Sequence, residues 1–227
     1  MKILPRHIFV IALFILIFTA TLRPAGDPDF WWHLRTGELI LDTGAIPHAD
    51  PFSYSASGQE WITHEWLSET VMYLLYGRLG MIPLIIFFSL IITAAYGFAY
   101  LRTRDQAKPY VAGFVLVVSA VASAPLWGVR PQMISLLLTS VFLYLLDCYE
   151  KNQKIAFLVP LPLLSMLWVN LHGGFIIGIG IVGVYWLGFM AKILFRGKGK
   201  AKGDPRAWKP VLTLAGVVVL CLLASLI

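Results

Sequence analysis

The chain has 227 residues, of which 59% are hydrophobic and only 13% are charged. This composition excludes an ordinary soluble domain, in which about a quarter of the residues are charged. The net charge of +6 does not indicate a nucleic-acid partner, because the basic residues lie between apolar runs in a pattern typical of membrane orientation.

Seven apolar runs predict an all-α membrane protein with about seven transmembrane helices, since a helix needs ~20 apolar residues to cross a bilayer. We treat residues 1–227 as a single transmembrane domain surrounded by membrane lipids. The last run has no polar tail, so we expect a further C-terminal part beyond it. The runs are Ile8–Leu22, Met81–Leu101, Tyr110–Trp127, Pro131–Leu146, Ile155–Leu171, Gly173–Phe195 and Pro210–Ile227.

The distribution of basic residues predicts the orientation of these helices. If the N-terminus is cytoplasmic, 14 of the 18 lysines and arginines fall in inner segments, as the positive-inside rule requires. The four that fall outside are Arg23, Arg35, Arg78 and Arg130.

Residues 23–80 form the only long hydrophilic segment, which the orientation places outside the membrane as the first outer loop. It carries eight of the twelve acidic residues, and ionisable groups gathered at one membrane face suggest a functional site. Apolar spacing predicts two interfacial helices, Phe30–Leu41 and His64–Leu79, with Thr63 as N-cap and Gly80 as the stop of the second. Tryptophans at both helices favour the headgroup zone.

Asp27-Pro28-Asp29 opens this loop. Proline favours an extended residue before it, and side chains two apart in extended chain point the same way. The two carboxylates could then bind one cation, or one could take a proton from an acceptor hydroxyl. The alternative is a helix start, with Asp27 as N-cap and Pro28 at the first helical position.

Glu65 is a second candidate acid, base or metal ligand. The alternative is that Glu65 simply belongs to the first turn of a helix and has no functional role.

Arg130 is the only charge in its outer turn and could hold a lipid phosphate bidentately, or simply extend toward the interface. His172 follows Asn170 in another outer turn and could bind phosphate or sugar, or relay a proton; water could equally satisfy this turn. The substrate-binding candidates are His33, His64, Arg130, Asn170 and His172.

With these motifs in place, the chain resembles the type C (GT-C) superfamily of polytopic membrane glycosyltransferases. Its bacterial glycosyltransferase-like members show a similar first outer loop opened by an Asp-x-Asp-like motif. The residues that carry the resemblance are Asp27-Pro-Asp29, Asp29-Phe-Trp-Trp-His33, Thr36-Gly37, Gly44-x-Ile-Pro47, Asp50-Pro-Phe-Ser53, Trp61, Glu65-Trp-Leu67, Arg130-Pro-Gln132 and Asn170-Leu-His-Gly-Gly174.

The resemblance implies transfer of a sugar from a polyprenyl-phosphate donor to a lipid, glycan or protein acceptor, outside the bacterial inner (plasma) membrane. Asp27 or Asp29 would be the catalytic base. Metal dependence varies among such families, so Mg²⁺ or Mn²⁺ at Asp27 and Asp29 is one alternative and a metal-free site is the other. Relatives have more spans and often a C-terminal outer domain.

Two other classes of function compete with this hypothesis. A non-enzymatic carrier or assembly subunit of envelope polysaccharide synthesis would place polar groups near the bilayer midplane, whereas these spans hold few ionisable residues. A metal-dependent hydrolase ranks last, because no histidine pair has the i, i+4 spacing of a zinc site.

Overall fold

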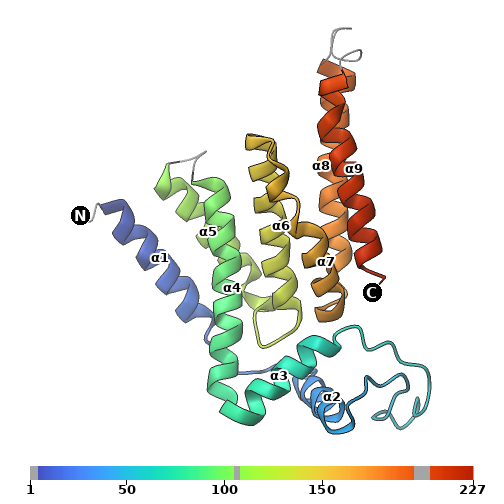
Figure 1. Ribbon diagram of the computed structural model, residues 1–227. Helices are drawn as coiled ribbons and strands as arrows, with labels where there is room; N and C mark the ends of the chain where they lie inside the picture. The colour runs from blue at the N-terminus through green and yellow to red at the C-terminus, as the bar shows by residue number, and fades with distance from the viewer. Residues whose placement is uncertain (1–4, 105–107, 197–204, 227) are drawn as a thin grey trace. The chain divides into compact units, whose positions relative to one another are not determined.

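The structure is a computed structural model that describes residues 5–104, 108–196 and 205–226 (Figure 1). Within these ranges it confirms the all-α class, because every regular element is a helix and the only β-type pairing is one isolated bridge between Ala49 and Glu60.

Five helical segments are long and apolar enough to cross a membrane, which indicates an integral membrane protein. Arg6–Thr21 and Ile155–Leu171 are helical and apolar but shorter. At 1.5 Å per residue they reach only about 24–26 Å, against a hydrocarbon core of about 30 Å. The predicted count of seven spans therefore stays a prediction. The five long segments are Met81–Thr103, Pro109–Leu126, Gln132–Asn152, Phe175–Phe195 and Pro205–Ala224.

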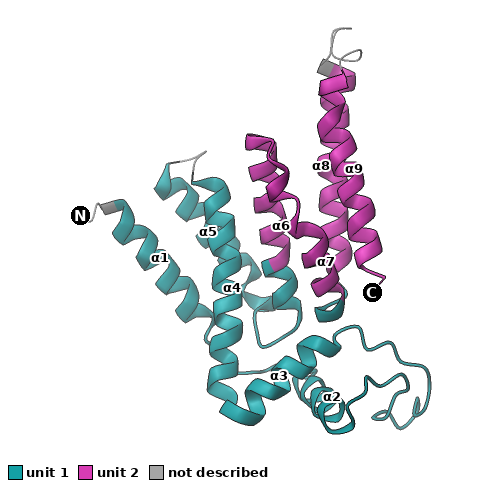
Figure 2. Ribbon diagram, viewed as in Figure 1, with its two compact units in different colours: residues 1–137, 170–173 teal, residues 138–169, 174–227 magenta. Residues whose placement is uncertain are grey.

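The chain forms two compact units (Figure 2). Unit 1 comprises residues 1–137 and 170–173, and unit 2 comprises residues 138–169 and 174–227. The short return of the chain at 170–173 brings a polar turn into the unit that contains residues 23–80.

Three apolar helices of unit 1 pack on one another: α1 (Pro5–Thr21), α4 (Met81–Thr103) and α5 (Pro109–Ser123). The α1 residues Ile8 and Ile15 are more than half exposed, as expected of a helix that faces lipid. A short 3₁₀ turn, η1 (Ala124–Leu126), follows α5.

The predicted loop helices are present as α2 (Phe30–Thr43) and α3 (Trp66–Leu79). They pack closely against each other, and α3 ends at Gly80, whose φ of 81° lets the chain turn directly into α4. Thr63 as N-cap was wrong: Glu65 precedes the first helical residue, and the Thr63 hydroxyl instead donates to the Pro47 carbonyl at 2.8 Å.

Gly37 sets the distance between α2 and α3. A Cβ atom at this position would lie 2.1 Å from the Glu69 carbonyl oxygen and 2.9 Å from Tyr73 Cβ. No side chain fits there, so the two backbones meet because this residue is glycine. The contact is made with Glu69 itself, and it also brings His33, one turn before Gly37 on α2, next to the Glu69 side chain.

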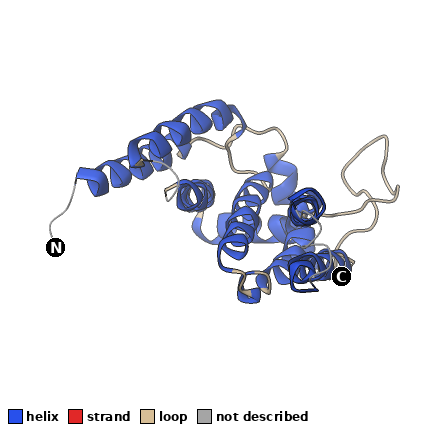
Figure 3. Cartoon of the chain, turned by 90° about the horizontal axis from the view of Figure 1, so that it is seen from above, coloured by secondary structure: helices blue, strands red, loops and turns tan. Residues whose placement is uncertain are grey.

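Loops join the helices throughout (Figure 3). The longest, residues 44–65, folds back on itself: Trp61 N–H donates to the His48 carbonyl and Asp50 N–H to the Gln59 carbonyl, both at 2.9 Å. The Asp50 side chain accepts from the backbone of Phe52 and Ser53 in a local turn. These bonds hold the loop as it returns to the start of α3.

Unit 2 contains most of α6 (Gln132–Asn152), η2 (Ile155–Phe157), most of α7 (Pro160–Leu171), α8 (Phe175–Arg196) and α9 (Pro205–Ala224). The helices α8 and α9 form its closest pair. Gly178 on α8 faces Trp168 and Phe142, and an added Cβ would lie only 2.6 Å from the Trp168 ring. This glycine serves helix packing.

We predict that Gly37→Ala destabilises the protein by about 1–3 kcal/mol, because the added methyl group would overpack the contact between α2 and α3. Detergent-denaturant unfolding followed by tryptophan fluorescence would measure this. Gly77→Ala is the matched control, since Gly77 is exposed on α3 with only ordinary contacts, and there alanine should stabilise by up to about 1 kcal/mol. Equal stability of the Gly37→Ala variant and the wild type would contradict the role of Gly37.

Candidate functional site

Glu65 lies at the centre of a group of histidines. Its Oε2 atom is 3.6 Å from Nδ1 of His33, and its Oε1 atom is 3.3 Å from Nε2 of His172 and 3.6 Å from Nε2 of His64. The three imidazoles come from α2, from the loop before α3 and from the 170–173 turn. The Glu65 side chain is only 10% exposed, so these rings form most of its surroundings.

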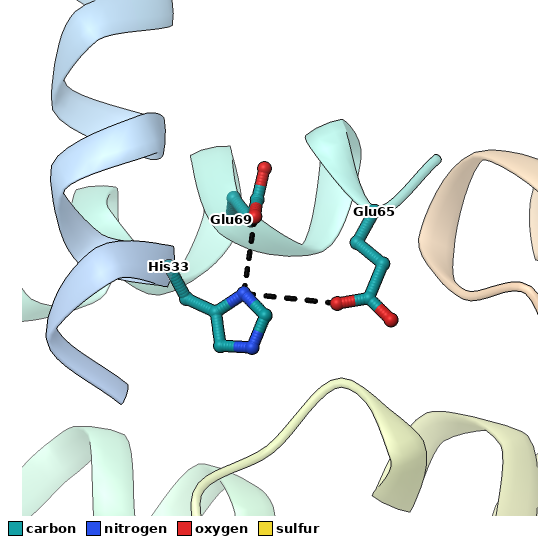
Figure 4. A group of neighbouring side chains, drawn as sticks. All are labelled: His33, Glu65 and Glu69. Carbon is teal, nitrogen blue, oxygen red and sulfur yellow. Dashed lines mark hydrogen bonds and ion pairs between the residues drawn. The ribbon is translucent and has the colours of Figure 1, made fainter. Parts of the chain in front are cut away.

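A second carboxylate joins the same group. Glu69 is fully buried, and its Oε1 atom is 3.0 Å from Nδ1 of His33 (Figure 4). One ring nitrogen of His33 thus faces both Glu65 and Glu69. The other Glu69 oxygen, Oε2, is buried without a hydrogen-bond partner among the described residues.

Local helix geometry explains why the two glutamates share one face. Residues four apart in a helix are neighbours on its surface, and the Glu69 N–H donates to the Glu65 carbonyl in the first bond of α3. His33 reaches them from α2 one turn before the Gly37 contact. The ring of Trp32 lies 4.2 Å from that of His33, centroid to centroid, and covers it.

Two hydrogen bonds hold the 170–173 turn against the start of α3. The Trp66 indole N–H donates to Asn170 Oδ1 at 2.8 Å, and the Ser68 hydroxyl donates to the Leu171 carbonyl at 2.5 Å. They place His172 beside Glu65. The hydroxyl of Ser135 lies 2.7 Å from Nδ1 of His172, which fixes the orientation of this ring.

The environment changes the proton affinities of these groups. Burial raises the pKa of Glu65, and His33 and His64 partly oppose this. Burial also raises the pKa of Glu69, again opposed by His33. For His172, burial lowers the pKa, and the nearby His64 and His33 lower it further. The group therefore contains a carboxyl of raised proton affinity beside an imidazole that favours its neutral form, a combination typical of acid–base sites.

In the described part of the chain, the basic side chains beside the Glu65 and Glu69 carboxylates are all histidines. Across the described residues, no lysine or arginine lies within ion-pair distance of Glu65 or Glu69. One ligand atom each from His33, Glu65 and Glu69 lies within 4.8 Å of the others. These three residues could hold a metal ion.

The Asp27-Pro28-Asp29 motif adopts a turn, and its side chains form no hydrogen bond or ion pair with this group among the described residues, although, beside the larger effect of burial, the charge of Asp29 also raises the pKa of Glu65. Asp29 N–H donates to Asp27 Oδ1 at 3.1 Å, and α2 begins at Phe30, later than the predicted helix start at Pro28. Asp27 forms an ion pair with Arg130, whereas Asp29 is exposed with αR backbone. Asp29 is thus not extended, and the two side chains have different surroundings, so the structure does not place both carboxylates on one face of an extended segment.

Two apolar grooves in unit 1 each end at an arginine. One, of about 330 Å³, runs between α1 and α5 and reaches Arg23. The other, of about 350 Å³, lies beside η1 and the start of α6 and includes Arg130. Arg23 lies over the Trp127 ring and donates to the Ala124 carbonyl at 2.8 Å. Apolar grooves that end at a cation suit a lipid chain with an anionic head.

The structure brings together five of the candidates: His33, His64, Glu65 and His172 directly, and Asn170 through Trp66. It places Asp27 and Arg130 in a separate pair. Sequence reasoning missed Glu69, although its position four residues after Glu65 on a predicted helix was a usable signal. It also missed Ser135, which only the fold brings to His172.

Comparison of the chain with protein families, curated proteins and solved structures finds no match.

We predict that Asp27 and Arg130 are energetically coupled, because both are partly buried, with side chains 10% and 31% exposed. A double-mutant cycle with Asp27→Asn and Arg130→Gln should give a coupling free energy of about 0.5–3 kcal/mol, measured by detergent-denaturant unfolding. Additive effects of the two substitutions would show that the pair contributes nothing to stability.

Proposed function

We propose that this protein is a membrane glycosyltransferase that moves a sugar from a polyprenyl-phosphate donor to a hydroxyl of a lipid, glycan or protein acceptor. The observation that carries the proposal is the buried Glu65 carboxylate surrounded by His33, His64 and His172. Such a group suits removal of a proton from a hydroxyl, and it lies in the polar loop next to membrane-spanning helices.

The proposed chemistry is a single displacement. Glu65 accepts the proton of the acceptor hydroxyl, whose oxygen forms a bond to the anomeric carbon of the sugar. The bond between that carbon and the phosphate oxygen breaks, and polyprenyl phosphate leaves with the bonding electrons. The raised pKa of Glu65 favours this role, because a stronger base takes a hydroxyl proton more readily. Asp27 and Asp29 remain the alternative bases predicted from the sequence.

The two grooves support a lipid-linked donor. A prenyl chain fits their apolar walls, and Arg23 and Arg130 offer guanidinium groups to a phosphate at their ends. Arg130 already pairs with Asp27, so a phosphate bound at Arg130 would share the guanidinium group with the Asp27 carboxylate. Arg23 has no carboxylate within ion-pair distance in the described part of the chain; it donates to the backbone carbonyls of Ala20 and Ala124 and lies over the Trp127 ring.

The same reaction requires residues 23–80 to face outward from the bacterial plasma membrane, with the N-terminus in the cytoplasm. We predict that Ser55→Cys, in the exposed part of the loop, reacts with a membrane-impermeant maleimide in intact cells. Lys154→Cys should react only after permeabilisation. The background is a chain with Cys148 and Cys221 replaced by alanine. Labelling of Lys154→Cys alone in intact cells would reverse the orientation.

Metal-dependent hydrolysis of the same lipid-linked substrate is the second candidate. The sequence has no histidine pair with the spacing of a zinc site, but the fold brings His33, Glu65 and Glu69 together from α2 and the start of α3. A hydrolase would release free sugar with water as acceptor, whereas a transferase would need an acceptor.

We predict that Glu65→Gln lowers sugar transfer by at least 100-fold at equal expression, within the range of losses expected when a general base is removed. The assay supplies membranes with labelled polyprenyl-phosphate hexose and separates transferred from free sugar. Glu60→Gln is the matched control, because Glu60 lies exposed in the same loop and should retain full transfer.

The outcomes separate the alternatives. Transfer at the wild-type level by Glu65→Gln, with transfer lost in Asp27→Asn or Asp29→Asn, would assign the base to the Asp27-Pro28-Asp29 motif. Free sugar without transfer would favour the hydrolase. No reaction of the wild type with any of several donors would favour a non-enzymatic carrier or assembly subunit.

A further inference from the structure

We infer that His33, Glu65 and Glu69 bind one divalent transition-metal ion, of the class of Zn²⁺ or Mn²⁺. The inference rests on the proposed function for its role in catalysis, and it names the cofactor of that site. It assigns the ion to residues of α2 and the start of α3 rather than to Asp27 and Asp29.

The distances fit a shared ion. Zinc binds imidazole nitrogen and carboxylate oxygen at about 2.0–2.2 Å, so two ligand atoms around a tetrahedral ion lie roughly 3.3–3.5 Å apart. His33 Nδ1 is 3.0 Å from Glu69 Oε1 and 3.6 Å from Glu65 Oε2. The three side chains converge on this small volume from two helices (Figure 4).

The charge of the group favours a cation. Two acidic side chains four apart on a helix repel each other, and a buried charge is costly unless it is paired or binds a metal. Neither glutamate has lysine or arginine within ion-pair distance among the described residues. Glu69 is fully buried, faces His33 and still has an oxygen without a hydrogen-bond partner in the described chain.

Neighbouring residues supply the outer contacts that metal ligands usually have. Ligating carboxylates are commonly hydrogen-bonded by a second layer of residues that fixes their orientation. His172 Nε2 lies 3.3 Å from Glu65 Oε1, the oxygen turned away from His33, and Ser135 lies 2.7 Å from the other nitrogen of His172. Glu65 therefore has one oxygen facing His33 and the proposed ion and the other beside His172.

The ligand types select the class of ion. Ca²⁺ and Mg²⁺ prefer oxygen ligands alone, whereas an imidazole in the set suits Zn²⁺ and related transition metals. One histidine and two carboxylates leave coordination positions open for a substrate oxygen. A bound ion would there supply positive charge to the phosphate leaving group of the proposed reaction.

Mn²⁺ alone is the probe for the test, because the free ion gives a strong electron paramagnetic resonance signal that binding broadens. We would treat the purified full-length chain in detergent with a chelator, remove the chelator and titrate with Mn²⁺. We expect one ion per wild-type chain. Glu69→Gln should weaken binding by more than 100-fold, and His172→Ala by about 10–100-fold through the outer contact.

Glu60→Gln is the matched control, since it removes one exposed carboxylate of the same loop and should bind Mn²⁺ as the wild type does. Helical circular dichroism would verify that Glu69→Gln is folded. Mn²⁺ should also raise the unfolding temperature of the wild type and of Glu60→Gln, but not that of Glu69→Gln, because only a bound ligand stabilises the native state.

The inference is overturned if the wild type binds no stoichiometric Mn²⁺ or Zn²⁺, or if Glu69→Gln and Glu60→Gln bind equally. Sugar transfer at the full rate by metal-free protein would also contradict the assignment of the ion as a cofactor of the reaction. Stoichiometric binding that depends on Glu69, without sugar transfer from any donor, would support the metal site and count against the proposed function alone.

Discussion

The arrangement of unit 1 depends on the need to accommodate two buried carboxylates, Glu65 and Glu69, one turn apart at the start of α3. Each is costly to bury, and each repels the other. In the folded chain, imidazoles from separate segments lie beside these two carboxylates. His33 reaches both carboxylates because Gly37 lets α2 approach α3 closely, and His172 reaches Glu65 because the 170–173 turn is bonded to α3.

The membrane helices provide the platform for this group. The turn at Gly80 joins α3 directly to α4, so the start of α3 is held relative to the apolar helices of unit 1. Asp27 and Arg130 form a separate pair that links the segment before α2 to the turn before α6. The Asp27–Arg130 ion pair and the carboxylate–histidine group thus consist of different residues. The first suits a structural role, and the second has the composition of an acid–base site.

The sequence indicated much of the candidate site, including Glu65 at its centre, but not Glu69. Glu65, His33, His64, Asn170 and His172 were identified as polar residues at one membrane face, and the structure brings them together. Asp27 and Asp29, which the sequence suggested could act together, have different surroundings, because Asp27 accepts a hydrogen bond from Asp29 N–H and pairs with Arg130 while Asp29 is exposed. Glu69 was missed because its spacing from Glu65 predicts only that the two share a helix face, and not that this face is buried against a histidine of another helix.

Apolar runs by themselves determined the all-α class, and glycine and aromatic spacing located α2 and α3 to within about two residues, because hydrophobic periodicity and chain-breaking residues act locally. Which residues meet across the fold is not a local property. The contact of His33 with Glu69, the close approach at Gly37 and the return of residues 170–173 to unit 1 depend on packing between segments far apart in the chain. Only the tertiary structure shows these three contacts. The free energy that stabilises them comes from burial and pairing, which exist only after the helices have packed together.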